Sequence, residues 1–130
     1  MNIENHVPTL ETCKKIQEAG WKNKWESPLY WIIHKEDGIQ LLFRDDFDTG
    51  CLEEYYPAPL LSELLEELYN LNMFPYVEST KYGGSALYLA TANIYKGIEK
   101  VKDRTQYHQN PAEAAAQLVL TLVEEGVFTL

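Results

Sequence analysis

The chain lacks most of the features that mark common chemistries. It contains two cysteines, Cys13 and Cys51, in neither a metal-type spacing nor a disulfide framework, so we expect two reduced thiols. Its three histidines, His6, His34 and His108, are widely separated and form no HxH or HExxH pattern. A Walker loop, a GxGxxG motif and a GxSxG motif are also missing from the sequence. We therefore expect no cofactor, and a non-enzymatic role is favoured over catalysis.

Long apolar runs and basic residues are scarce too. No window reaches the roughly 18 apolar residues that a membrane span needs. The N-terminus has no basic start followed by an apolar run, so we expect no secretory signal and a cytoplasmic location. Eleven Lys and Arg stand against 20 Asp and Glu, which gives a net charge of −9. This charge repels nucleic acids and anionic membranes, so both are unfavoured partners.

The residues that are present suit one folded domain, residues 1–130. The composition is 45% hydrophobic and 24% charged, which is ordinary for a globular protein. Three Trp, nine Tyr and four Phe provide bulk for a core. A chain of this length can bury a sizeable core without a disulfide or a metal.

Three helices are predicted from apolar periodicity and end signals. The first runs over about 10–19, with Thr9 as its N-cap and Gly20 as its stop. The stretch EYYPAPLLSELLEEL, residues 54–68, predicts a loop followed by a helix with a leucine stripe. In the last helix, from 111 to about 125, Asn110 can cap, Pro111 suits the first position, and Glu113 gives a capping-box-like spacing.

Two hairpins are predicted between these helices. Asp37-Gly38 lies between two apolar runs, and a two-residue loop there would pair His34 with Leu41 and Ile32 with Phe43. Gly83-Gly84 separates two further strands over about 74–82 and 85–92. The stretch 93–110 is compatible with a helix, a strand extension or a long loop. The order is then α-β-β-α-β-β-α, which predicts an α+β fold with an antiparallel sheet of two β-hairpins and about three helices.

Three segments of the chain resemble small uncharacterised proteins encoded by bacteriophages and prophages. The resembling stretches are TCKKIQEAGW, YYPAPLLSELLEEL and NPAEAAAQLVLTLVEEG, and together they cover about a third of the sequence. The resemblance implies a compact intracellular α+β protein of mobile-element origin. It brings no known activity and no functional residues.

Candidate binding residues come from apolar groups that the predicted fold leaves exposed. In the predicted register, Trp31, Ile33 and Leu42 lie on the sheet face away from the core, where a partner or a second copy of the chain could cover them. Tyr55 and Tyr56 precede the second helix and could serve as exposed anchors, or they could close the core. These five residues predict association with a protein, including self-association as a homo-oligomer.

Two charged regions support alternative functions. Residues 45–80 contain nine acids and no Lys or Arg, so they could mimic a DNA surface. Within this region Asp45, Asp46 and Asp48 are weak metal candidates, and a metal-dependent enzyme using the 45–54 cluster is the last alternative; the EF-hand register fails. Tyrosines alternate with basic residues over 96–107, a pattern that could bind a single nucleic-acid strand.

Overall fold

The structure is a computed structural model, and it describes residues 3–21, 27–34, 38–46, 54–71, 73–82, 85–96 and 98–127. The helical elements are η1 (Ile3–His6), α1 (Leu10–Glu18), η2 (Arg44–Asp46), α2 (Leu61–Asn70) and α3 (Pro111–Glu124). The strands are β1 (Leu29–His34), β2 (Gly38–Phe43), β3 (Glu54–Pro57), β4 (Pro75–Tyr82), β5 (Ser85–Lys96) and β6 (Glu99–His108).

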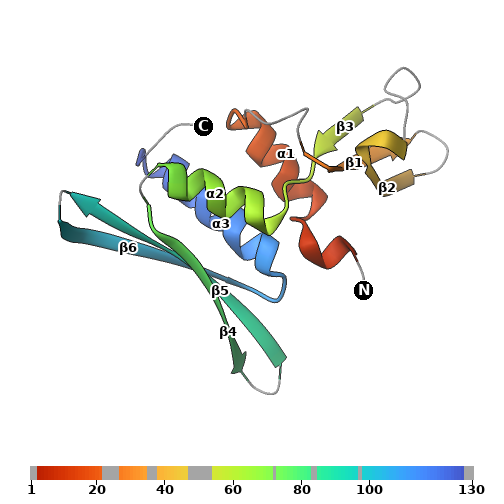
Figure 1. The fold of residues 1–130 in the computed structure, drawn as a ribbon. Coiled ribbons are helices and arrows are strands. Elements are labelled where there is room, and N and C mark those ends of the chain that lie inside the picture. Colours follow the sequence, from red (N-terminus) through yellow and green to blue (C-terminus); the bar gives the residue numbers. More distant parts are fainter. Residues whose placement is uncertain are drawn as a thin grey trace.

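The predicted α+β class, its three helices and its antiparallel hairpins are confirmed. The two hairpins do not share one sheet, however. One sheet has the order β2-β1-β3 and the other the order β4-β5-β6, and the three α-helices lie between the two sheets (Figure 1). Among the described residues, no helix is long and apolar enough to cross a membrane.

Each sheet gains a strand that local patterns did not predict. Residues 54–57 were predicted to be a loop, and this was wrong: they form β3, in which Tyr56 lies opposite Trp31 and Tyr55 opposite Ile32. The ambiguous stretch 93–110 is a strand extension and a new strand, because β5 continues to Lys96 and then pairs with β6. In both cases the partner strand supplies the hydrogen bonds that decide the conformation.

The register of the first hairpin also differs from the prediction. His34 lies opposite Gly38, three positions from the predicted partner Leu41, and Trp31 lies opposite Leu41. A shift by an odd number of residues moves side chains to the other face of a sheet. Leu41 therefore shares a face with Trp31 and not with Ile32. Of the predicted turn residues, Asp37 lies outside the described residues, and Gly38 has a φ of 77°. The second hairpin has the predicted register, with Tyr82 opposite Ser85 and Pro75 at the strand's start.

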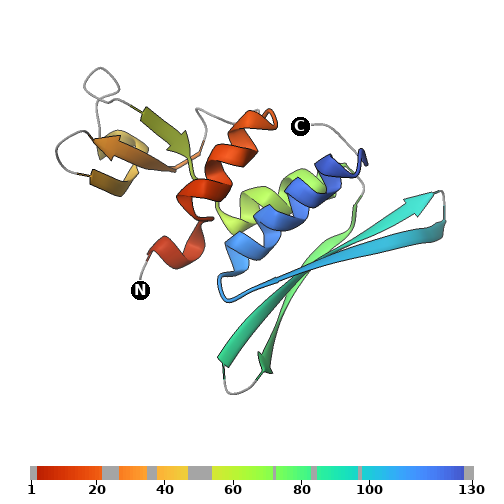
Figure 2. The same cartoon turned by 180° about the vertical axis from the view of Figure 1, so that it is seen from behind.

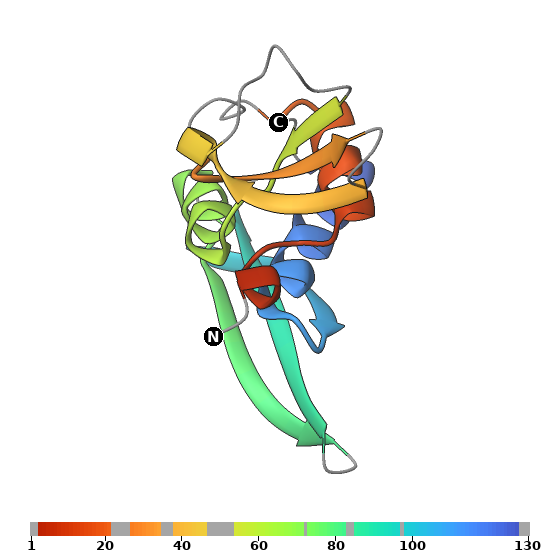
Figure 3. The ribbon, with the colours of Figure 1, turned by 90° about the vertical axis from the view of Figure 1, so that its right-hand side faces the viewer.

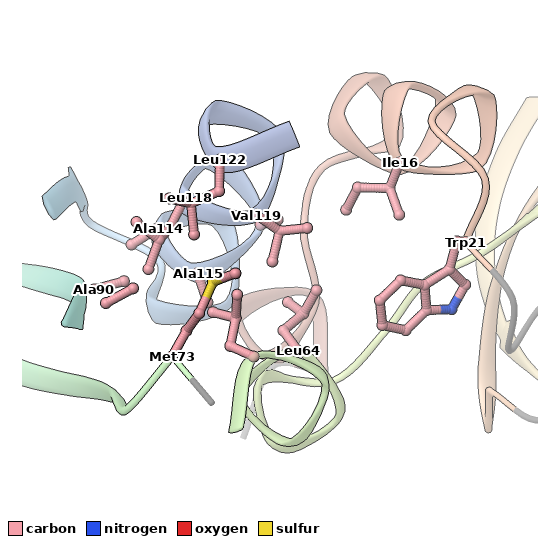
Figure 4. Close-up of a cluster of buried hydrophobic side chains, with 13 residues drawn as sticks. Ile16, Trp21, Leu64, Met73, Ala90, Ala114, Ala115, Leu118, Val119 and Leu122 are labelled. Atoms are coloured by element: carbon pink, nitrogen blue, oxygen red, sulfur yellow. The ribbon is translucent and has the colours of Figure 1, made fainter. Parts of the chain in front are cut away.

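Two hydrophobic clusters hold the layers together. The larger one joins α2 and α3 to the β4–β6 sheet and includes Leu64, Leu68, Ala90, Leu118 and Leu122 (Figure 4). The predicted leucine stripe of α2 is confirmed, since its members are buried or pack against these clusters. The smaller cluster lies between α1 and the β2-β1-β3 sheet, which are neighbours in Figure 2, and is formed by Val7, Cys13, Leu29 and Ala58.

Glu113 connects the first helix to the last. Its side chain is only 3% exposed, and its Oε1 accepts a hydrogen bond from the Thr9 N–H at 2.8 Å. Its Oε2 accepts from the Thr12 hydroxyl at 2.6 Å and from the Gln117 amide at 2.7 Å. We predicted a capping box within α3, which was wrong: the carboxylate caps α1 instead, and Asn110 caps α3 through its own side chain. Proximity to the N-terminus of α1 also favours the negative charge.

These hydrogen bonds decide the ionisation of Glu113. Burial would raise the pKa of its carboxyl group, since a charge is costly away from water. Hydrogen bonds from Thr12, Thr9 and Gln117 outweigh burial and hold the pKa below the ordinary value of 4.5. The buried group is therefore charged near neutral pH.

We expect Glu113→Gln to lower the free energy of unfolding by about 1–3 kcal/mol, the range for hydrogen bonds to a charged group. The amide loses an acceptor that two donors now share. Urea unfolding followed by circular dichroism measures this change. Glu124→Gln, an exposed site on the same helix, is the matched control and should change stability by less than about 0.5 kcal/mol.

The difference between wild type and Glu113→Gln should depend on pH. A carboxyl group whose pKa is lowered by folding stabilises the native state above its unfolded pKa, and this contribution disappears as pH falls through the folded pKa. The difference should therefore be constant near neutral pH and shrink below about pH 4.5. Unfolding curves over a pH series test this, and a difference that grows on acidification would contradict the assignment.

Candidate functional site

The β4–β6 sheet has one covered and one uncovered face. Ala90 and Ala92 of β5 point into the cluster shared with α3. On the same face, Gln106 donates to the Thr121 hydroxyl of α3 at 3.1 Å, and Arg104 pairs with Glu125 just beyond α3 at 2.8 Å. Figures 1 and 2 show α2 and α3 on this side of the sheet, with no described element on the other side. Figure 3 shows the β4–β5 hairpin extending beyond the helices.

Residues that alternate with these form what we name the open sheet face. Four of its aromatic rings are well exposed: Phe74 at 51%, Tyr76 at 44%, Tyr95 at 42% and Tyr107 at 60%. The strand pairing places Glu78, Leu89 and Tyr107 in one row and Tyr76, Thr91 and Thr105 in the next. The open sheet face consists of Phe74, Tyr76, Glu78, Leu87, Leu89, Thr91, Asn93, Tyr95, Lys100, Asp103, Thr105 and Tyr107.

Several residues of the open sheet face contact one another. Thr91 and Thr105 share a hydrogen bond of 2.9 Å across the strands, and Thr91 is only 4% exposed although no helix covers it. Phe74 and Tyr95 form an edge-to-face pair with ring centroids 5.2 Å apart. The Asn93 amide and backbone N–H both reach the Phe74 carbonyl at 3.5 Å. These contacts hold the Phe74–Tyr95 pair and the Thr91–Thr105 pair in place on the open sheet face.

Charge on the open sheet face is sparse and slightly acidic. Lys100 and Asp103 pair at 3.5 Å, and both are about half exposed. Glu78 is exposed and has no ion pair among the described residues. Its carboxylate is next to Tyr76 along β4 and in the same row as Tyr107. The charge without an ion pair on this surface is thus the Glu78 carboxylate, which shares the face with Tyr76 and Tyr107.

The predicted single-strand patch over 96–107 is divided by the sheet. Tyr95 and Tyr107 lie on the open sheet face, but Arg104 lies on the covered face and binds Glu125 through Nε. Lys100 is occupied by Asp103. The side chains of Lys96 and Lys102 lie outside the described residues. The aromatic groups of this pattern therefore do not share a face with its arginine.

The five predicted binding residues are not gathered on one surface. Trp31 packs on the smaller cluster, and its Nε1 donates to the Pro8 carbonyl at 2.9 Å. Leu42 lies opposite Tyr30 and so on the other face from Trp31, whereas Ile33 is half-buried. The register that placed Trp31, Ile33 and Leu42 together was wrong.

Tyr55 and Tyr56 are each only partly exposed. The Tyr55 ring meets Tyr30 edge-to-face, with centroids 6.4 Å apart. The Tyr56 ring packs against the smaller cluster, lies 5.5 Å from the Lys14 ammonium and bonds Glu54 through its hydroxyl. Both rings join β3 to its neighbours within the chain.

The weak metal candidates do not form a metal site among the described residues. Asp45 and Asp46 are exposed in η2, and Asp48 lies outside the described residues. Within the described ranges, no group of three or more metal-ligating side chains converges.

Cys13 has the surroundings of a structural thiol. It is buried and 3.6 Å from the Pro8 carbonyl. Burial raises its pKa well above the ordinary value, and the charge of Glu113 raises it further. The thiolate that catalysis would need is therefore strongly disfavoured. Cys51 lies outside the described residues.

A groove of about 340 Å³ lies where the starts of α1 and α3 meet, beside Trp31, His108 and Asn110. Its polar groups mainly serve the fold. The Asn110 amide donates to the Val7 carbonyl at 2.9 Å, and His108 Nδ1 accepts from the Asn110 N–H at 2.9 Å. This groove is a junction of capped helix ends.

Sequence reasoning missed Phe74 and Tyr76 as surface groups. Both belong to a segment that was predicted as a strand, and their alternation with Pro75 and Val77 was visible. The missing information was which face the helices cover, because that follows from α3 packing on Ala90 and Ala92.

No protein-family model, curated protein or solved structure matches this chain.

Stability measurements can separate surface rings from core rings. We expect Trp31→Ser to lower the free energy of unfolding by about 2–4 kcal/mol, because the ring packs and its N–H is hydrogen-bonded. Tyr107→Ser removes a 60% exposed ring and should cost less than about 1 kcal/mol. Chemical unfolding of both variants measures the two losses in the free energy of unfolding. Equal losses would mean that Tyr107 is a structural group.

Proposed function

We propose that this protein is a non-enzymatic, cytoplasmic accessory protein of bacteriophage or prophage type that binds another protein through the open sheet face. The observation that carries the proposal is the set of four exposed aromatic rings on one uncovered sheet face. Aromatic side chains are enriched in binding hot spots, and contiguous exposed apolar surface commonly marks an interaction site.

The surface chemistry supports a protein partner more than a nucleic acid. Stacking proteins combine aromatic rings with free basic residues along the strand path. Here Arg104 is committed to Glu125, Lys100 is committed to Asp103, and the chain carries a net charge of −9. Mimicry of DNA by residues 45–80 is less supported, because Asp45 lies in η2, Glu66 in α2 and Glu78 in β4, in separate parts of the fold (Figure 1).

Site-specific photo-crosslinking in cells that encode the protein tests the proposal and does not require the partner to be identified first. We expect a photoactivatable phenylalanine analogue in place of Tyr107 to give discrete protein adducts, because this ring is exposed to solvent at the proposed interface. The same analogue in place of Tyr69, which is 64% exposed on α2, is the matched control and should give none.

The mass of the adduct also identifies the kind of association. An adduct of twice the chain mass would indicate self-association. Light scattering at two protein concentrations should then show a dimer, and Tyr107→Ser should convert it to a monomer. Absence of adducts at Tyr107, or equal adducts at Tyr69, would contradict binding through the open sheet face.

A further inference from the structure

We propose that the open sheet face binds a cationic polypeptide segment in which Arg or Lys side chains alternate with apolar ones. This inference rests on the proposed function and specifies the chemistry of the partner. It follows from the position of the unpaired carboxylate, from the exposed aromatic rings, and from the size and charge of the surface.

Glu78 and its neighbours form a receptor for a cation. Tyr76 is two positions from Glu78 on the same face of β4, and Tyr107 lies in the same row across Leu89. Exposed tyrosine rings attract guanidinium and ammonium groups, and the Glu78 carboxylate on the same face adds a charged acceptor for them. Arg104 is held on the covered face by Glu125, so no described basic side chain of the protein occupies this position.

The other end of the open sheet face is apolar and nearly neutral. Phe74 and Tyr95 form an edge-to-face pair there, and the charges of Lys100 and Asp103 offset each other. Leu89 and the Thr91–Thr105 pair connect the two ends. A partner that matches this surface needs apolar groups along its length and positive charge over the Glu78 end.

Size and charge favour a segment over a second copy of the chain. From Leu87 to Tyr95 the open sheet face extends about 26 Å along the strands and about 14 Å across them. Its projected area of about 360 Å² is smaller than the roughly 800 Å² of accessible surface that each partner buries in a stable interface between whole proteins. Two copies would also each bring a net charge of −9, which opposes their association. A cationic segment is favoured on both grounds.

Titration of the full-length ¹⁵N-labelled protein with synthetic peptides tests the inference. The probe is a peptide of about ten residues with alternating Arg and Leu, a length that spans the face. We expect it to shift the amide signals of Tyr76, Glu78, Leu89 and Tyr107, with an affinity that falls as salt is added. A peptide of the same length with Glu in place of Arg is the matched control and should not bind.

Paired variants identify the carboxylate. Glu78→Gln should weaken binding of the Arg-Leu peptide about three- to tenfold, since it removes a charge beside two rings. Glu66→Gln makes the same change on the exposed face of α2 and should leave the affinity unchanged. Both variants alter exposed side chains, so neither is expected to unfold the protein.

The possible outcomes are distinct. Equal binding of the Glu-Leu peptide would overturn the preference for cations. Shifts confined to the acidic residues of α2 would overturn the open sheet face as the binding site. Failure of both peptides would overturn it too, and adducts at Tyr107 would still support the proposed function. Shifts on the same face caused by oligothymidylate alone, or by raising the protein concentration alone, would replace the cationic segment with a nucleic acid or a second copy.

Discussion

The carboxylate of Glu113 is buried between α1 and α3, where it accepts hydrogen bonds from the Thr9 N–H, the Thr12 hydroxyl and the Gln117 amide. An ionised group in this position would be strongly destabilising without these donors, and the donors at the start of α1 would be unsatisfied without the carboxylate. The two requirements are met together only when α1 is placed against α3. This contact between residues about a hundred positions apart therefore fixes the orientation of the N-terminal part of the fold, and Asn110 reinforces it through the Val7 carbonyl.

The position of α3 in turn determines both faces of the β4–β6 sheet. Small residues on α3 and β5, such as Ala114 and Ala90, let the helix approach the sheet closely and form the larger cluster. This packing covers one face of the sheet and leaves the alternate residues of the same strands on the uncovered face. Stability is concentrated on the covered side, so the opposite side can carry aromatic rings that contribute little to folding. The exposed rings at Phe74, Tyr76, Tyr95 and Tyr107 are the observation on which the proposed binding role rests.

The same physical constraints weigh against chemistry at the groups that first suggest it. Cys13 is buried beside a carboxylate, which keeps its thiol protonated. His108 accepts a hydrogen bond from the backbone N–H of Asn110 at the start of α3. The Trp31 Nε1 donates to the Pro8 carbonyl. These groups are satisfied within the fold. The open sheet face differs because its four aromatic rings are well exposed and the Glu78 carboxylate has no ion pair among the described residues.

Local signals determined the α+β class, the three helices with their caps, and the register of the β4–β5 hairpin, since periodicity and turn residues act over a few positions. The first hairpin shows the limit of this reasoning: Asp37-Gly38 predicted one register, and pairing of β1 with both β2 and β3 settled on another. The role of Glu113 was not predicted for the same reason, because a capping box is local whereas two of its three donors, Thr9 and Thr12, lie at the start of α1. Which sheet face remains open could not be read from alternation alone, because alternation gives two faces and does not say which one a helix covers. The sequence by itself therefore determined the elements and their amphipathic patterns, and only tertiary packing decided the strand partners, which sheet face stays open and the partner of the buried carboxylate.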